Sequence, residues 1–240
     1  MPRDRHVMRA LELQRDPSLP PTLELDPGAC PILRADGAMK ERLERRDVPP
    51  PPCRPGCPVR AFFDAARAAG APVEIDVGSG YGRFARGRAA AHPEIRLLAL
   101  DQEGARVARS DVLSRRAGQT NLAYLVGEAR YALEFCVPPE SVSAVHVLFP
   151  DPWPKDRHAR NRFFRAPNVE LVHRLLRRGG VLHAATDSAI YFAQMLETMA
   201  ADARFERVEA PARGPDERTD FERKFLAQGK TVSEAAWRKR

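Results

Sequence analysis

The sequence predicts an α/β fold built on a doubly wound, mostly parallel sheet of seven strands. From about residue 60 of the 240-residue chain, short apolar segments alternate with segments of helical composition, and short connections join them. A cluster of glycines also follows the first apolar segment, where such folds turn from a strand into a helix. Strand–helix alternation of this kind indicates parallel strands with helices on both faces of the sheet.

The sequence predicts helices and strands in alternation along the chain. A helical segment at 61–69 ends at Gly70, because glycine readily adopts the left-handed conformation that closes a helix. Buried strands are expected at the apolar segments 73–77, 96–100, 122–126, 143–149 and 181–185. Helices are expected after the glycine cluster up to residue 91, and at 103–117, 169–178 and 189–200. FERVEA (205–210) and TDFERKFLAQG (219–229) are expected to pair and to give the sheet an antiparallel edge strand.

The first 60 residues are expected to form an N-terminal extension to a domain at 61–240. Residues 47–58 (DVPPPPCRPGCP) hold too many prolines for a helix or a central strand, so we interpret them as a linker. No apolar run approaches the ~20 residues of a membrane-spanning helix, and no apolar secretory signal is visible at the start. With only four cysteines there is no disulfide framework, which predicts a cytoplasmic protein without membrane contact.

The four cysteines are candidate metal ligands. Three residues separate Cys53 from Cys57, with Cys30 upstream and Cys136 far downstream. This spacing contains no C-x2-C pair of the kind that holds zinc. Ordinary thiols and no metal are therefore expected.

Basic residues exceed acidic ones and are concentrated in one segment. Lys and Arg number 39 against 32 Asp and Glu, for a net charge of +7, and only five of the 39 are Lys. Between Lys155 and Arg178, eight basic residues stand against two acidic ones. Because the guanidinium group matches phosphate, this segment indicates a polyanionic partner. A solvated surface is the alternative that charge alone leaves open.

The glycine turn indicates a nucleoside ligand. The first strand ends in Asp76-Val77, and Gly78, Gly80 and Gly82 follow it. Glycines at this turn let the backbone approach a ligand, and the start of the helix offers free N–H groups. A dinucleotide site would need glycine at Arg83, and the carboxylate before the turn would repel a pyrophosphate. The carboxylate suits the cationic end of S-adenosylmethionine (SAM), which is therefore the expected cofactor.

Two further acids follow the next two strands. Asp101 lies roughly 20 residues beyond Gly82, where an acid commonly holds the ribose hydroxyls of adenosine. Glu128 follows the third strand, where it would face the adenine ring. Favourable charge or capping at a helix N-terminus is the alternative for both. Because carboxyl ends of parallel strands meet at one edge, these acids are predicted to lie together.

The fourth strand runs into an unusual segment, FPDPWPK (149–155), which the basic residues follow. Three prolines stiffen it and would hold Asp151, Trp153 and Lys155 at the ligand edge. Asp187, after the fifth strand, adds another carboxylate there. The alternatives are a tight turn around a buried tryptophan for the segment and a helix N-cap for Asp187.

The string FPDPWPK-x-RH-x-R-x-R, the later TD (186–187) and the final T-x-FE-R (219–223) resemble the bacterial tRNA (guanine-N7-)-methyltransferase family, over about residues 72–230. The resemblance implies a class I, Rossmann-like methyltransferase that uses SAM, with tRNA as its partner and the variable-loop guanine, position 46, as its target. It implies SAM contacts at Asp76, Asp101, Glu128 and Asp151. It implies tRNA contacts at Lys155, Arg157, His158, Arg160, Arg162, Asp187, Thr219 and Glu222.

This sequence departs from the family pattern in three places. The family usually has Glu, Glu and Asp where this chain has Asp76, Asp101 and Glu128, so the charge is kept while each side chain changes by one methylene. Ala159 and Asn161 stand where the family is usually polar or basic. The first 60 residues do not resemble the basic arm of the family.

The expected chemistry needs no general base. Guanine N7 carries a free lone pair, so no proton must leave before methyl transfer, and catalysis rests on proximity and electrostatics. Asp151 and Asp187 are the predicted catalytic residues, which orient guanine and offset its growing positive charge. Lys155 is expected to hold a phosphate or the base edge, and His158 is not needed as a base. The arginines would supply phosphate contacts and salt dependence.

Two other functions stay open on the sequence alone. A SAM-dependent methyltransferase acting on another RNA or on a small molecule would fit the unusual N-terminus. A non-catalytic RNA-binding protein would fit the altered acids. A nicotinamide-dependent dehydrogenase is disfavoured, because Arg83 breaks its fingerprint. The chain is expected to be a monomer or a homodimer.

Overall fold

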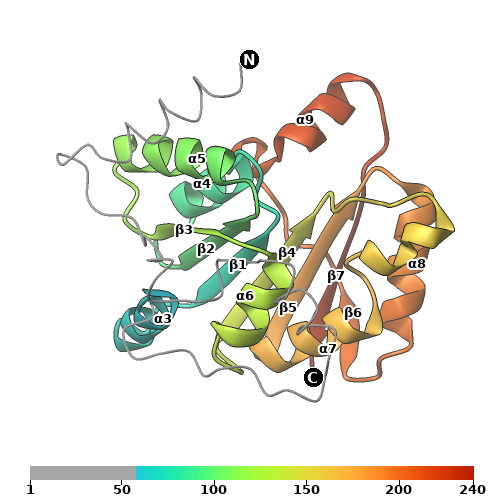
Figure 1. The fold of residues 1–240 in the computed structure, drawn as a ribbon, viewed down its shortest axis with the longest axis horizontal. Coiled ribbons are helices and arrows are strands. Elements are labelled where there is room, and N and C mark those ends of the chain that lie inside the picture. Colours follow the sequence, from blue (N-terminus) through green and yellow to red (C-terminus); the bar gives the residue numbers. More distant parts are fainter. Residues whose placement is uncertain (1–57) are drawn as a thin grey trace.

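The computed structural model describes residues 58–240 of the chain, which fold around a seven-stranded sheet (Figure 1). The strand order is β3-β2-β1-β4-β5-β7-β6. The strands are β1 (Val73–Val77), β2 (Arg96–Asp101), β3 (Leu122–Val126), β4 (Val142–Leu148), β5 (Leu176–Thr186), β6 (Phe205–Val208) and β7 (Ser233–Lys239). The α-helices are α3 (Pro58–Ala68), α4 (Arg83–Ala91), α5 (Gly104–Arg116), α6 (Ala129–Phe135), α7 (Ala166–Leu175), α8 (Ala189–Ala200) and α9 (Asp220–Ala227).

The predicted fold class is confirmed. β1 to β5 pair in parallel in the order 3-2-1-4-5, and all five strands predicted from apolar segments are present. The strand order reverses between β1 and β4, so their carboxyl ends border the crevice where open α/β sheets bind ligands. β7 is antiparallel to both β5 and β6.

Of the two strands predicted near the C-terminus, the first is confirmed and the second is wrong. FERVEA does contain β6, but TDFERKFLAQG forms helix α9, and the strand that pairs with β6 is β7. The helix begins there because the Thr219 side chain accepts a hydrogen bond from the Glu222 backbone N–H at 3.0 Å, which caps the first turn. The antiparallel strand therefore lies one place in from the edge, and short β6 forms the edge itself.

A second correction concerns the helix expected at 169–178. Helix α7 ends at Leu175, and β5 begins at once with Leu176 paired to Val142. The pairing then shifts, so that Val181 lies opposite Ala144. A Cβ atom on Gly180 would stand 2.9 Å from the Arg177 carbonyl oxygen. The glycine pair therefore permits a bulge within β5 rather than closing the helix.

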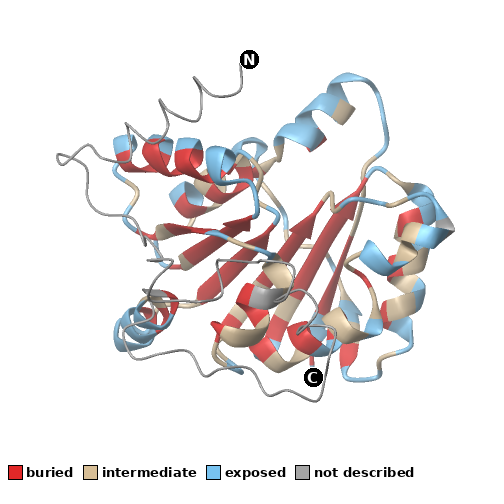
Figure 2. Ribbon diagram, in the orientation of Figure 1, coloured by how far each residue is buried: buried red, intermediate tan, exposed pale blue. Residues whose placement is uncertain are grey.

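The two faces of the sheet are packed differently. Helices α3, α6, α7 and α8 bury the main apolar core on one face, and most of the sheet is buried (Figure 2). Helices α4 and α5 cover β2 and β3 on the other face through a smaller apolar cluster. On that second face, β1, β4, β5 and β7 carry buried polar side chains, namely Glu74, Asp76, His146, His183 and Glu234 (the last half-buried).

The expected extension at 1–60 and linker at 47–58 lie almost entirely outside the described residues, as do Cys30, Cys53 and Cys57. Cys136 is buried behind α6. The first described helix, α3, starts at Pro58 rather than at the expected 61, and its Val59 and Phe63 are buried in the main core. Within the described part of the chain, no helix is both long and apolar enough to cross a membrane.

Candidate active site

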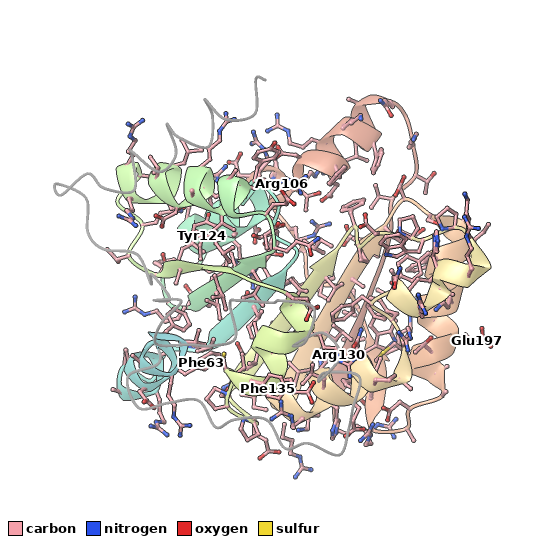
Figure 3. All side chains as sticks on the ribbon, viewed as in Figure 1. Phe63, Arg106, Tyr124, Arg130, Phe135 and Glu197 are labelled. Carbon is pink, nitrogen blue, oxygen red and sulfur yellow. The ribbon has the colours of Figure 1, made fainter. Side chains whose placement is uncertain are left out.

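The glycine turn joins β1 to α4 in a shape that requires glycine. Gly78, Gly80 and Gly82 have φ angles of 77°, 57° and 64°, which side-chain-bearing residues rarely adopt. At Gly82 space is limiting as well, because a Cβ atom would lie 2.6 Å from the Tyr124 hydroxyl. Figure 3 labels Tyr124 on β3, below helix α5, where its hydroxyl is 3.0 Å from the Ser114 hydroxyl. The turn thus packs closely on the neighbouring strand and helix.

Asp76 and Asp101 lie together beneath this turn, as predicted. Asp101 Oδ2 accepts a hydrogen bond from Gly80 N–H at 2.8 Å, and its Oδ1 accepts one from Glu103 N–H at 2.9 Å. Asp76 is only 2% exposed, and its Oδ2 has no hydrogen-bond partner among the described residues. Burial, reinforced by the negative charge of Asp101, raises the pKa of Asp76 to about 8.

These features fit the cationic end of SAM. A buried carboxylate oxygen without a hydrogen-bond partner destabilises the fold unless a ligand supplies the partner. A cationic ligand would supply both a compensating charge and hydrogen bonds. The side-chain-free turn above it lets a ligand approach the backbone. The residues present therefore suit the cofactor that the sequence predicts.

Glu128 lies at the same edge but is exposed. It follows β3 in the loop before α6, and that loop is tied to Asp101 by a 3.0 Å hydrogen bond from Gly127 N–H to the Asp101 carbonyl oxygen. Its carboxylate accepts a hydrogen bond from Arg130 N–H at 3.1 Å, in the first turn of the helix. The helix-terminus role considered from the sequence is therefore present.

The PDPWPK loop (residues 150–155) follows β4 directly. The Phe149 N–H donates to the Ala185 carbonyl oxygen at 2.7 Å, which binds the start of the loop to the end of β5. Phe149 and Trp153 have φ angles of 54° and 41°, an uncommon conformation for large side chains that concentrates at functional sites. Asp151 and Lys155 are exposed, while Trp153 is half-buried with its ring edge-on to His158 at 5.6 Å.

Asp187 is exposed at the end of β5, beside this loop. It does not cap helix α8, because Ser188 is the N-cap and its hydroxyl accepts from Tyr191 N–H at 3.3 Å. The capping alternative for Asp187 is therefore wrong. Asp187 stands at the carboxyl edge of the sheet directly after β5, which neighbours β4, the strand that leads into the loop with Asp151.

The predicted RNA-contacting residues after the loop differ in what they face. They lie on a 3₁₀ helix, η2 (Asp156–Asn161), and its flanks. Lys155, Arg157 and Arg160 are exposed, and their charged groups have no ion-pair partner among the described side chains. Arg162 instead points back and donates to backbone carbonyls of the PDPWPK loop.

Thr219 and Glu222, the last predicted tRNA contacts, have structural roles. Thr219 caps α9, and Glu222 is 4% exposed. The Glu222 carboxylate binds Arg213 through bonds of 2.7 and 3.1 Å. α9 stands out from the upper edge of the molecule in Figure 1, and Asp220 at its start pairs with Arg83 of α4 at 2.6 Å. Thr219 and Glu222 thus fix the start of α9, and the Asp220–Arg83 pair holds this helix beside the glycine turn.

A chain of buried charges that the sequence analysis missed runs under this region. On the second face of the sheet, Glu74 binds both nitrogens of the Arg88 fork at 2.9 Å and His146 at 2.9 Å. His146 and His183 face each other with 3.3 Å between their Nδ1 atoms. The one available signal was a polar residue inside each otherwise apolar strand segment.

The chain continues to the C-terminal segment. His183 lies 3.4 Å from Glu234, and Glu234 pairs with Arg213, which also holds Glu222. At the other end Arg88 binds Glu217 at 3.0 Å. The pKa of Glu74 falls to about 2, because hydrogen bonds from His146 and Arg88 outweigh its burial. Residues 213–222, which lead into α9, are therefore tied to β1 and β7 through buried ion pairs.

The comparisons with known proteins agree with this geometry. A family model described as "Putative methyltransferase" matches residues 70–235. The tRNA (guanine-N(7)-)-methyltransferase of Halorhodospira halophila is 36% identical over 175 residues, which are 71% of this chain and 76% of that protein. The chain belongs to this family. The Burkholderia vietnamiensis protein of the same name is 35% identical over 189 residues, 78% of this chain and 74% of that protein.

Solved structures give the same fold. The 16S rRNA methyltransferase KamB aligns with a TM-score of 0.56 at 19% identity, over 75% of this chain and 93% of that one. The 16S rRNA (adenine(1408)-N(1))-methyltransferase of Catenulisporales acidiphilia aligns with a TM-score of 0.53 at 21% identity, over 75% and 91% of the two chains. At these identities the likeness concerns the fold, which is that of the class I methyltransferases.

Proposed function

We propose that this chain methylates N7 of the variable-loop guanine, position 46, in tRNA, with Asp151 and Asp187 as its catalytic residues. Membership of the tRNA (guanine-N(7)-)-methyltransferase family makes it a SAM-dependent tRNA methyltransferase. The observation that carries the assignment of residues is the Phe149–Ala185 hydrogen bond. It fastens the PDPWPK loop to the end of β5 and so brings two exposed carboxylates to one edge of the sheet.

The chemistry follows from the residues at that edge. SAM supplies a methyl group activated by a sulfonium charge. Asp76 and Asp101 are proposed to hold the cofactor, together with the glycine turn, Glu128 and Asp151. Asp151 and Asp187 accept hydrogen bonds from guanine and offset the positive charge that its ring gains on N7 methylation. No side chain has to remove a proton, so positioning and charge are the main contributions of the protein.

The proposed tRNA surface is the exposed part of the basic segment. Lys155 at the end of the PDPWPK loop and the exposed Arg157 and Arg160 after it are proposed to bind phosphates, together with the half-buried His158, which gives affinity without reading sequence. Because tRNA is the substrate, we infer a cytoplasmic protein, acting as a monomer or a homodimer.

The test is methyl transfer from labelled SAM to tRNA taken from cells that lack 7-methylguanosine, followed by digestion of the product. Label is expected in 7-methylguanosine at position 46. Asp151→Asn and Asp187→Asn are expected to lower the rate at least 100-fold, because each removes a charge at the reacting base. Asp64→Asn, an exposed carboxylate on α3, is the matched control and should keep the wild-type rate.

Two outcomes would contradict the proposal. Label in another nucleoside would leave a SAM-dependent methyltransferase with a different RNA target. Binding of tRNA with neither SAM binding nor methyl transfer would favour the non-catalytic RNA-binding alternative, because the altered acids would then have cost the cofactor site. Isothermal calorimetry measures SAM binding, and tRNA binding by the same preparation separates this case from a misfolded protein.

A further inference from the structure

We propose that Arg162 is a positioning residue that holds the backbone of the PDPWPK loop in place, rather than a contact for tRNA. The inference rests on the proposed function, because the loop carries Asp151 and Lys155. The inference is based on geometry. The guanidinium group of Arg162 points toward the backbone of the loop, and a neighbouring helix holds the guanidinium in this position.

The loop cannot hold its own shape by backbone hydrogen bonds. Three of its six residues are proline and have no N–H to donate. Among the described residues, 150–154 take part in no backbone–backbone hydrogen bond. Trp153 nevertheless keeps a φ angle of 41°, which is unfavourable for a tryptophan and persists only where surrounding contacts enforce it. Some other group must therefore fix the loop.

Arg162 supplies these contacts through its fork of donors. Its Nε donates to the Pro152 carbonyl oxygen at 2.8 Å, and its Nη2 donates to the Trp153 carbonyl oxygen at 2.8 Å. A longer bond of 3.3 Å joins Nε to the Trp153 oxygen as well. Two successive peptide carbonyls, placed between Asp151 and Lys155, are thus bound by one planar group.

Helix α8 fixes the guanidinium itself. The third donor, Nη1, bonds to Gln194 Oε1, and the guanidinium carbon lies 5.8 Å from the centroid of the Tyr191 ring. Both side chains are held in turn by Phe164, whose N–H donates to the Tyr191 hydroxyl at 3.2 Å and whose carbonyl oxygen accepts from Gln194 at 3.2 Å. Arg162 therefore links the loop to helix α8, which packs in the main core.

This arrangement separates Arg162 from its basic neighbours. Each of its three guanidinium nitrogens donates to a protein acceptor and one face lies against an aromatic ring, so few donors remain for a phosphate. Arg157 and Arg160 are exposed and direct their charges to solvent. Lysine cannot replace Arg162, because a single ammonium does not reproduce the planar fork that reaches both carbonyls.

The test compares two quantities for each variant: the single-turnover rate of methyl transfer at saturating tRNA, and the slope of log binding constant against log salt concentration. Arg162→Ala is expected to lower the rate about 10- to 100-fold, because displacement of reacting groups by about 1 Å has effects of this size. Its salt slope should equal that of the wild type. Arg157→Ala should instead reduce the slope by about 1, as the loss of one phosphate contact does.

Three further variants sharpen the test. Arg162→Lys keeps the charge and is expected to be as slow as Arg162→Ala. Gln194→Ala removes one anchor and should lower the rate by a smaller factor with the slope unchanged, which keeps the test open if Arg162→Ala does not fold. Arg67→Ala, an exposed arginine on α3, should match the wild type in both quantities.

The proposal is overturned if Arg162→Ala keeps the wild-type rate at saturating tRNA and loses about one unit of slope, or if Arg162→Lys restores the rate. Failure of the proposed function looks different. In that case the wild-type chain itself transfers no methyl group to tRNA guanine, and no comparison among the arginine variants is needed.

Discussion

Asp76 combines two properties that have measurable consequences at the scale of one residue: it is buried, and its Oδ2 lacks a partner among the described residues. Its pKa of about 8 exceeds that of an unfolded aspartate, about 3.9. Between these values the native state binds one proton more than the unfolded state, so stability decreases as pH rises. At higher pH the folded protein must bury a charged carboxylate next to Asp101.

The first prediction is a pH dependence of folding stability. Relative to Asp76→Asn, the free energy of unfolding of the wild type should fall by about 1.4 kcal/mol per pH unit between about pH 5 and pH 8. Urea unfolding at pH 5, 6.5 and 8 measures the difference. Equal pH profiles for the two proteins would show that Asp76 ionises normally in the folded chain.

The second prediction concerns SAM binding at the same residue. A cationic ligand favours the ionised carboxylate, so binding near pH 7 should release about one proton, and affinity should rise with pH toward about 8. Calorimetry in two buffers of different ionisation enthalpy measures the released proton. Asp76→Asn should bind more weakly and release no proton beyond any that SAM itself loses. Proton release that persists in the variant would remove Asp76 from the SAM site.

At the scale of an element, α4 and residues 215–217 approach each other too closely for any side chain at Gly87. A Cβ atom there would lie 2.0 Å from the Asp216 carbonyl oxygen. Gly87→Ala should therefore destabilise the protein by about 2 kcal/mol, although alanine favours a helix over glycine. Thermal unfolding measures the change. Gly104→Ala in α5 is the control, because its Cβ would meet nothing nearer than 3.7 Å, and it should be neutral or slightly stabilising.

The position of α9 depends on the Glu222–Arg213 ion pair, which is buried on both sides. Glu222→Gln should cost about 2 kcal/mol, because it weakens the pairing of a buried arginine that Glu234 still partly compensates. Hydrogen exchange should then speed up across α9. Glu206→Gln breaks an exposed pair with Arg238 and should cost less than about 0.5 kcal/mol. Normal exchange in α9 after Glu222→Gln would argue against this structural role.

Some helices and strands could be predicted from the sequence and others could not. Strands β1 to β5 were predictable because most of their residues are buried on both faces of the sheet, which makes their segments mainly apolar. Strand β7 was not, since SEAAWRK contains alanines and charges and becomes a strand through pairing with β5 and β6. Helix α9 did carry a signal, a threonine three residues before a glutamate and phenylalanines four apart.

The residues of the candidate site were likewise predictable from the sequence only in part. Asp76, Asp101 and Asp187 were placed correctly at strand ends because the topology of a parallel sheet fixes where its carboxyl ends meet. Arg162 and Glu222 carry the same charge as their exposed neighbours, and nothing in the local sequence tells which of them turns inward. Arg162 contacts the backbone oxygen of Trp153 and the side chain of Gln194, and Glu222 contacts Arg213. These partners lie in other parts of the fold. Such contacts exist only once the tertiary structure has formed.

At the scale of the whole molecule, charge should govern how tRNA binds. The net charge is +7, and Lys155, Arg157 and Arg160 are exposed at the end of the PDPWPK loop and just after it. Replacing these three by alanine should reduce the slope of log binding constant against log salt by two to three, since each phosphate contact contributes about 0.7 to 0.9. Fluorescence anisotropy with labelled tRNA at several salt concentrations measures the slope.

A matched triple variant tests whether the location of the charge matters or only its amount. Arg60, Arg67 and Arg96 lie on or near α3 and the amino end of β2, away from the carboxyl edge of the sheet. Their replacement by alanine lowers the net charge by the same three units, so any effect of overall charge on tRNA attraction is equal in both triple variants. We expect the control slope to stay within about 0.5 of the wild type, because long-range attraction is screened within roughly 10 Å at 0.1 M salt while direct phosphate contacts are not. Equal losses of slope in the two variants would mean that tRNA is held by diffuse charge, and the basic segment after the PDPWPK loop would lose its assignment as the tRNA surface.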